Sequence, residues 1–98
     1  MVVKVTATPE GCRPEPGRVP AGAIEVVATN LDAPTISEVE VRTSNLSEVM
    51  GEKENLIEGM TAQFSADLAP GRYIVNCPGA AVSHWSLVAV PATATSGR

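Results

Sequence analysis

The chain has 98 residues and a formal net charge of −4, which is enough for one domain with one modest core. Its hydrophobic fraction of 44% comes mainly from small aliphatic side chains, because it contains one Phe, one Tyr and one Trp. The acidic balance argues against a nucleic-acid partner, since phosphates need a basic surface, and no apolar run of about 20 residues predicts a membrane span.

Short runs rich in β-branched residues alternate with Gly, Pro, Asn and Asp, which predicts strands along most of the chain. The clearest strands are predicted over residues 2–8, 23–29, 36–43, 61–68, 72–77 and 84–90. Residues 13–17 are extended but rich in proline, which predicts an edge strand or a loop. Residues 46–50 are predicted as a short strand or a helical turn, and residues 20–22 as a turn.

About seven or eight short strands with turns between them predict an all-β sandwich or barrel. Residues 1–90 are expected to form this domain, and residues 91–98 a linker or disordered tail. The first residues lead directly into a strand without the features of a signal peptide. We therefore expect either a cytosolic protein or a secreted one whose signal segment is absent from this sequence.

Cys12 and Cys77 each follow the end of a predicted strand. As a disulfide they would close a loop of about 66 residues, which would stabilise the fold by about 4 kcal/mol in the chain-entropy model. As thiolates they would suit a soft or borderline metal such as copper or zinc. The residues alone leave three possibilities open: a disulfide, two metal ligands, or two unrelated buried thiols.

Glu38 and Glu40 project from the same face of a predicted strand, because side chains alternate along a strand. Carboxylates of this kind suit hard cations such as ferric iron, whereas the alternative is a solvated outer face. The segment 52–55, followed by Glu58, forms a second acidic group in a predicted surface loop. Taken alone, that group is expected to be solvated.

His84 is the only histidine. A blue-copper centre needs two histidines and a cysteine, so no such centre is expected within this chain. His84 remains a candidate ligand, with an ordinary partly buried histidine as the alternative. A Cys–His pair is available in Cys77 and His84, but no motif supports nucleophilic catalysis.

Nearly all of residues 2–90 resembles the cupredoxin-like domain found at the N-terminus of EfeO-type iron-uptake proteins. The order and spacing of several short motifs carry the resemblance. They are the strand at 3–8, Cys12 with Pro14, the turn at 19–22, Glu38-Val39-Glu40, Glu52-Lys53-Glu54-Asn55 with Gly59, and the run 68–73 leading to Cys77.

The resemblance implies a cupredoxin-like Greek-key β-sandwich without a type 1 copper centre. It implies a metal-binding module, for copper or iron, in a periplasmic or extracellular ferrous-iron uptake system, with no enzymatic activity of its own. Family members normally add a helical, peptidase-like domain and work with an iron permease and a haem peroxidase. The family's proposed site corresponds to Cys12, Cys77 and Glu38, with Glu40 and His84 as further candidates.

Three departures from the family bear on that site. Val75 stands where the family site can include a methionine, Val39 replaces a tryptophan, and the residues after Cys77 differ. Losing the methionine removes a soft ligand and favours the alternative, a structural or protein-interaction sandwich with a Cys12–Cys77 disulfide and no metal site. If Val39 faces the core, Glu38 faces outward and meets the cysteines only at one end of the sandwich or through a bulge.

Overall fold

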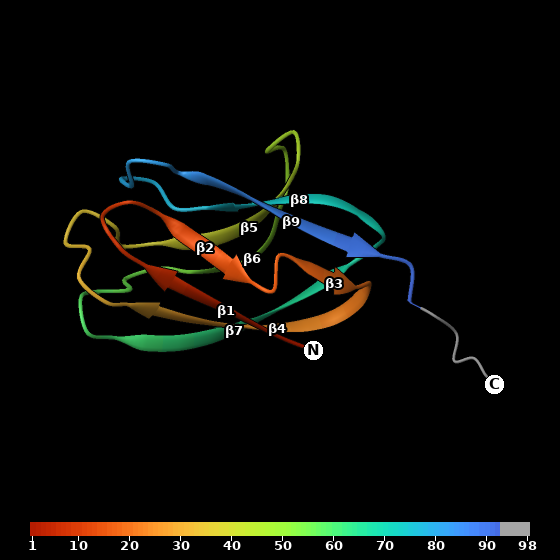
Figure 1. Cartoon of the computed structure of the whole chain (residues 1–98), viewed down its shortest axis with the longest axis horizontal. Coiled ribbons are helices and arrows are strands. Elements are labelled where there is room, and N and C mark those ends of the chain that lie inside the picture. The colour runs from red at the N-terminus through yellow and green to blue at the C-terminus, as the bar shows by residue number, and fades with distance from the viewer. Residues whose placement is uncertain (93–98) are drawn as a thin grey trace.

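A computed structural model describes residues 1–92 and consists of two packed β-sheets (Figure 1). Within those residues every regular element is a strand, and none forms a helix that could cross a membrane. The strands are β1 (Val2–Ala7), β2 (Cys12–Glu15), β3 (Arg18–Pro20), β4 (Gly22–Asn30), β5 (Val39–Thr43), β6 (Val49–Lys53), β7 (Thr61–Leu68), β8 (Gly71–Asn76) and β9 (His84–Val90).

The first sheet has the strand order β2-β1-β4-β7 and the second β3-β9-β8-β5-β6. Two neighbouring pairs are parallel, β1 with β4 and β3 with β9. The other pairs are antiparallel. The chain therefore crosses repeatedly from one sheet to the other, as an antiparallel hairpin meander would not.

Small aliphatic side chains fill the space between the sheets. On β1 the buried positions are Val3, Val5 and Ala7, and the residues between them are exposed. This period of two follows from the pleat of a strand with one face against the core. Tyr73 is the one buried aromatic side chain among the described residues, and its hydroxyl donates to the Ala69 carbonyl at 2.7 Å.

One end of the sandwich collects four loops, which we call the disulfide pole: residues 8–11, 31–38, 54–60 and 77–83. They follow or precede the strand ends that lie on the left in Figure 1. Backbone hydrogen bonds join them, for example from Val82 to the Glu10 carbonyl at 2.8 Å and from Leu56 to the Ser37 carbonyl at 2.8 Å. The pole is therefore one connected surface built from distant parts of the sequence.

The predicted all-β sandwich is confirmed, with nine strands where seven or eight were expected. The proline-rich segment 13–17 contributes the edge strand β2, as one of its two readings predicted. The strand expected over 36–43 begins only at Val39, because residues 31–38 form a loop at the pole. β3 was missed because it has only three residues, and its last residue, Pro20, was assigned to the turn predicted at 20–22. The predicted tail lies almost wholly outside the described residues and stays a prediction.

Candidate metal site

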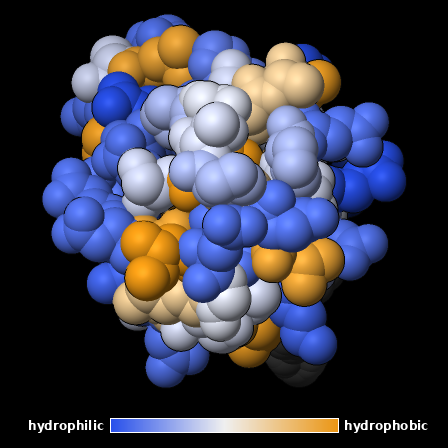
Figure 2. All heavy atoms as spheres, turned by 90° about the vertical axis from the view of Figure 1, so that its left-hand side faces the viewer, coloured by the Kyte–Doolittle hydropathy of each residue, from blue (hydrophilic) through white to orange (hydrophobic). Residues whose placement is uncertain are grey.

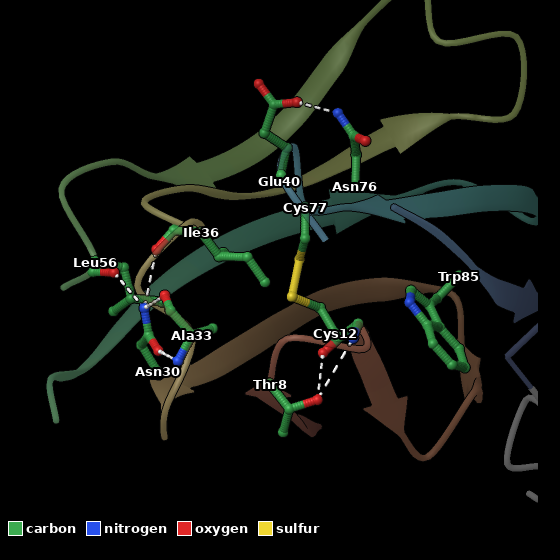
Figure 3. Close-up of a disulfide and its surroundings, with 12 residues drawn as sticks. Thr8, Cys12, Asn30, Ala33, Ile36, Glu40, Leu56, Asn76, Cys77 and Trp85 are labelled. Carbon is green, nitrogen blue, oxygen red and sulfur yellow. Dashed lines mark hydrogen bonds between the residues drawn. A yellow bond between two sulfur atoms is a disulfide. The ribbon is translucent and has the colours of Figure 1, made fainter. Parts of the chain in front are cut away.

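Cys12 and Cys77 form a disulfide, with their Cα atoms 6.2 Å apart. Cys12 begins β2 and Cys77 follows β8, so the bond joins the two sheets at the disulfide pole (Figure 3). Both residues are fully buried. Of the alternatives that the sequence left open, the structure contains the disulfide. Bonded sulfurs are not thiolates, so the thiolate ligation predicted for these residues does not apply in this state.

Glu38 lies on the opposite side of the second sheet from the disulfide. Glu40 on β5 pairs with Asn76 on β8, and both side chains project away from the sulfurs (Figure 3). Extending this register by one residue sets the inward-facing Val39 opposite Cys77, so Glu38 points outward with Glu40. The predicted set of two cysteines and Glu38 is therefore not brought together, because the sheet separates the carboxylate from the sulfurs.

The structure instead groups three carboxylates on that outer face. Oxygen atoms of Glu38, Glu52 and Glu54 all lie within 4.8 Å of one another. Glu52 is on β6 directly opposite Glu40 on β5. A shallow pocket of about 200 Å³ lies beside this carboxylate cluster and is lined by Ser37, Glu38, Glu54 and Asn55. Three carboxylates offer only oxygen ligands, which hard cations prefer.

Glu52 and Glu54 were expected to be solvated, and both are exposed. The structure also places them beside Glu38. A signal for this proximity is present in the sequence. A hairpin that joins 39–43 to the acidic segment brings a second Glu-x-Glu stretch next to the first. What the sequence did not reveal is the pairing register, which decides whether the two pairs share a face.

Glu38 has a raised pKa. Burial raises the pKa of its carboxyl first, and the charge of Glu40 and hydrogen bonding to Glu52 raise it further. Carboxylates crowded on one face repel one another, so each favours protonation of its neighbour. A cation placed among them would relieve that repulsion and release the proton.

Glu40 has a lowered pKa although its side chain is nearly buried. The Arg42 guanidinium holds the pKa of this carboxyl down, with Arg42 Nε donating to Glu40 Oε1 at 2.7 Å, while burial acts in the opposite direction. The Asn76 amide also donates to Oε1, at 2.8 Å. Glu40 is thus an ionised carboxylate whose oxygens are already occupied, and it is less available to a metal than Glu38.

Replacing Glu38 or Glu40 by glutamine is expected to change the free energy of unfolding in opposite directions. Glu38→Gln is expected to stabilise the fold, by less than about 1 kcal/mol since the site is partly open to solvent. Because the pKa of Glu38 is raised in the folded protein, its ionised form destabilises the fold. The stability gained by Glu38→Gln is therefore complete above the pKa of the folded protein and vanishes below the ordinary value of 4.5. Urea unfolding at a series of pH values measures it.

Glu40→Gln is expected to destabilise the fold by about 1–2 kcal/mol at neutral pH, because it removes a charge-assisted bond to Arg42. A lowered folded pKa gives stability that is present above 4.5 and is lost as the pH falls through the folded pKa. The same unfolding series is the measurement. Changes of equal sign for the two variants would contradict this account.

His84 begins β9 and pairs with Asn76, which in turn pairs with Glu40. His84 is thus on the same outer face as Glu40 but two strands away, about 10 Å at the usual strand spacing. It is exposed. Among the described residues it does not join the group of three carboxylates, so the structure does not bring this candidate ligand into the cluster.

Asn30 at the end of β4 fixes the loops that carry two members of the cluster. Its amide nitrogen donates to the carbonyls of Ala33, Ile36 and Leu56 at 2.9–3.0 Å. Its oxygen accepts from the Ala33 amide at 2.9 Å. Figure 3 shows the buried Asn30 side chain bonded to Ala33, Ile36 and Leu56. Glu38 and Glu54 each lie two residues from one of these anchors, so Asn30 joins the two segments that carry them.

A larger hollow, of about 250 Å³, lies beside β1 and β2 and is lined by Thr6, Thr8, Glu10, Gly11, Arg13, Glu15 and Trp85. Trp85 packs against Gly11, where an added Cβ would overlap the indole ring. The Arg13 guanidinium stands 5.8 Å from the ring centroid. This hollow holds no group of three metal-ligating side chains among the described residues, so the predicted metal chemistry fits the carboxylate cluster better.

No protein-family profile matches the chain. The curated iron uptake system component EfeO of Yersinia pseudotuberculosis and that of Yersinia pestis are each 32% identical to it over 75 residues. The match covers 76% of this chain and 19% of EfeO. The chain therefore spans about a fifth of the length of these relatives.

Two solved structures of auracyanins, which are cupredoxins, share the fold. Auracyanin B has a TM-score of 0.73 at 15% identity, over 92% of this chain and 88% of its own. The Na-dithionite reduced auracyanin from Roseiflexus castenholzii has a TM-score of 0.72 at 13% identity, over 92% and 97%. These likenesses concern the fold, and they confirm the predicted cupredoxin-like sandwich.

Proposed function

Because the chain is a cupredoxin-like domain of the EfeO type, we propose that it binds iron as cargo within an extracytoplasmic ferrous-iron uptake system. The similarity to an iron uptake component supports a role in metal uptake. The carboxylate cluster of Glu38, Glu52 and Glu54 supports the choice of iron. With the cysteines bonded to each other, the nearby ligands are oxygens, which suit iron better than cuprous copper.

The observation that carries the proposal is the grouping of the three carboxylates of Glu38, Glu52 and Glu54. The raised pKa of Glu38 agrees with this crowding. Glu40 adjoins the cluster and contributes negative charge, while Arg42 and Asn76 occupy its oxygens. In this proposal Glu38 and Glu54 bind the cation first, since they line the open pocket. Glu52 closes the site from β6.

Calorimetric titration of the oxidised protein with Fe²⁺ under anaerobic conditions tests this function. Glu38→Gln/Glu54→Gln is expected to weaken binding by at least about tenfold, as much as the loss of an outer-shell partner costs in known metal sites. The matched control is Glu48→Gln/Asp67→Asn, which removes the same charge from other exposed positions. Equal weakening by both variants would show general attraction to an acidic protein, and not a site.

The cysteines provide a second, independent comparison. Cys12→Ser/Cys77→Ser is expected to leave Fe²⁺ affinity within about twofold, because the sulfurs lie on the other side of the sheet. Cu⁺ titration of the chemically reduced wild type, set against the same variant, measures thiolate ligation directly. Iron binding that disappears with the cysteines would contradict the carboxylate proposal and favour the family's cysteine site.

The second candidate function is a structural or protein-interaction sandwich without a metal site. The fully buried disulfide that joins the two sheets favours it. The absence of any Fe²⁺ binding by the wild type in the first titration would decide for this candidate.

The resemblance to full-length EfeO-type proteins leads to further proposals about location and partners. The domain would act in the periplasm or outside the cell, next to a helical peptidase-like domain, with an iron permease and a haem peroxidase as partners. It would supply metal binding or docking and no catalytic step of its own. The resemblance to EfeO-type proteins supports these assignments.

A further inference from the structure

Three exposed apolar side chains lie on three different loops of the disulfide pole. Leu31 is 62% exposed, Ile57 66% and Val82 46%. They account for half of the six large apolar side chains that are strongly exposed within the described residues. Single exposed apolar residues are ordinary, but three on one end of a small domain suggest a surface that is covered by something else.

Backbone hydrogen bonds connect the loops that carry these three residues. The Gly59 amide donates to the Asn30 carbonyl at 2.6 Å, which sets the loop of Ile57 beside Leu31. The Leu31 amide donates to the Ala7 carbonyl at 3.0 Å, at the start of loop 8–11. Loop 8–11 in turn accepts the bond from Val82. The loops of Ile57 and Val82 are therefore connected to the start of loop 31–38, the first directly and the second through loop 8–11.

The fourth contact closes the pole. The Thr35 hydroxyl donates to the Gly79 carbonyl at 3.1 Å, which fixes loop 31–38 against loop 77–83. Gly79 has a φ of 97°, and an added Cβ would overlap the Thr35 carbonyl. A residue with a side chain does not fit there without moving one of the loops. The surface is thus held in one arrangement before any partner arrives, which lowers the entropic cost of binding.

Each exposed apolar residue has an acidic neighbour. Asp32 follows Leu31, Glu58 follows Ile57, and the Glu10 backbone is bonded to Val82. The four loops contain five acidic residues and no lysine or arginine: Glu10, Asp32, Glu38, Glu54 and Glu58. Figure 2 looks at this end of the molecule and shows apolar islands separated by hydrophilic side chains.

We propose that the disulfide pole is a docking surface for a protein whose contact face has lysine or arginine side chains around an apolar centre. Ile57, Leu31 and Val82 would bury apolar area in the complex. The surrounding carboxylates would steer and orient a basic partner. A second copy of this chain fits poorly, because every charged residue in the loops of both poles would be acidic and the two copies would repel each other.

The proposal does not depend on iron. Its three apolar residues lie outside the carboxylate cluster, although Glu38 and Glu54 belong to two of the pole loops. A partner docked here would nevertheless contact the edge of that cluster, so cargo and partner would share one end of the domain.

Cytochrome c, a small basic protein with lysines around an exposed apolar haem edge, serves as the probe. Titrated into ¹⁵N-labelled metal-free protein at about 10 mM ionic strength, where screening is weak, it is expected to shift amide resonances of the four pole loops. Binding is expected to weaken by about tenfold on raising the salt to about 150 mM.

Matched variants separate a specific surface from general charge attraction. Glu10→Gln/Asp32→Asn/Glu58→Gln is expected to weaken binding about tenfold, whereas Glu15→Gln/Glu48→Gln/Asp67→Asn, with the same net charge, is expected to weaken it less than about threefold. Leu31→Ser/Ile57→Ser/Val82→Ser should also weaken it at least about threefold, and the exposed pair Val2→Ser/Val49→Ser should not.

Three outcomes would overturn the proposal. They are the absence of binding at low salt, shifts spread equally over both ends of the sandwich, and equal effects of the two charge variants. Concentration-dependent self-association through the pole, measured by sedimentation, would assign the surface to a second copy instead. Fe²⁺ affinity measured on the same variants keeps this result separate from the metal proposal, because none of them alters Glu38 or Glu54.

Discussion

Cys12→Ala/Cys77→Ala is expected to unfold with a free energy about 4 kcal/mol smaller than that of the oxidised protein. The disulfide joins residues 65 apart in the sequence, so breaking it restores a large amount of conformational freedom to the unfolded chain. A domain of this size has a total stability of about 5–15 kcal/mol. The loss is therefore between about a quarter and most of the stability expected for such a domain.

Urea unfolding followed by the fluorescence of Trp85 measures this effect, since Trp85 packs against Gly11 next to Cys12. Adding a reductant should lower the stability of the wild type towards that of the variant and leave the variant unchanged. A difference below about 1 kcal/mol would show that the disulfide contributes little to the stability of the sandwich. If the loss is as large as expected, the iron titration of the variant that lacks both cysteines is made without urea and at a temperature at which that variant is folded.

Asn30→Ala is expected to lower the free energy of unfolding by about 3–5 kcal/mol. The side chain is fully buried and makes four hydrogen bonds. Its removal leaves the Ala33 amide and the carbonyls of Ile36 and Leu56 without this partner in a buried place, whereas the Ala33 carbonyl still accepts from the Ile36 amide at 3.1 Å. Buried polar groups that lose their partners carry a desolvation cost of about 1–3 kcal/mol each, partly relieved when the loops relax.

Asn30→Asp removes the donated hydrogen bonds while it keeps the volume of the side chain. A carboxylate still accepts from the Ala33 amide but cannot donate to the carbonyls of Ala33, Ile36 and Leu56. We therefore expect a loss at least as large as that of alanine at neutral pH. Asn45→Ala is the control, because Asn45 is an exposed turn residue with bonds to Thr43 and Ser47, and its loss should stay below about 1 kcal/mol.

Hydrogen exchange separates a local role of Asn30 from a global one. In a folded Asn30 variant, the amides of residues 33–38 and 54–60 should exchange faster than those of β8 and β9. Fe²⁺ affinity should fall together with their protection, because these loops carry Glu38 and Glu54. Uniform loss of protection across both sheets would show that Asn30 supports the whole fold and does not specifically position the cluster.

The strands with strong alternation could be predicted from the sequence, because burial of one face imposes a period of two on the side chains. β1, β4, β7, β8 and β9 were found within one or two residues in this way. β3 and the start of β5 were not, since both depend on contacts with distant segments. The three-residue β3 exists because it pairs with β9, and residues 31–38 form a loop around the Asn30 side chain.

The candidate site shows the same division. The sequence by itself indicated that Glu38 and Glu40 point to the same side and that no two-histidine copper centre is available, and it left the cysteines as bonded, as ligands or as unrelated buried thiols. Only the tertiary structure decided that the cysteines form a disulfide and that Glu52 and Glu54 approach Glu38. Side-chain direction along one strand is a local property of the backbone, whereas meetings across strands depend on register and on how the sheets pack.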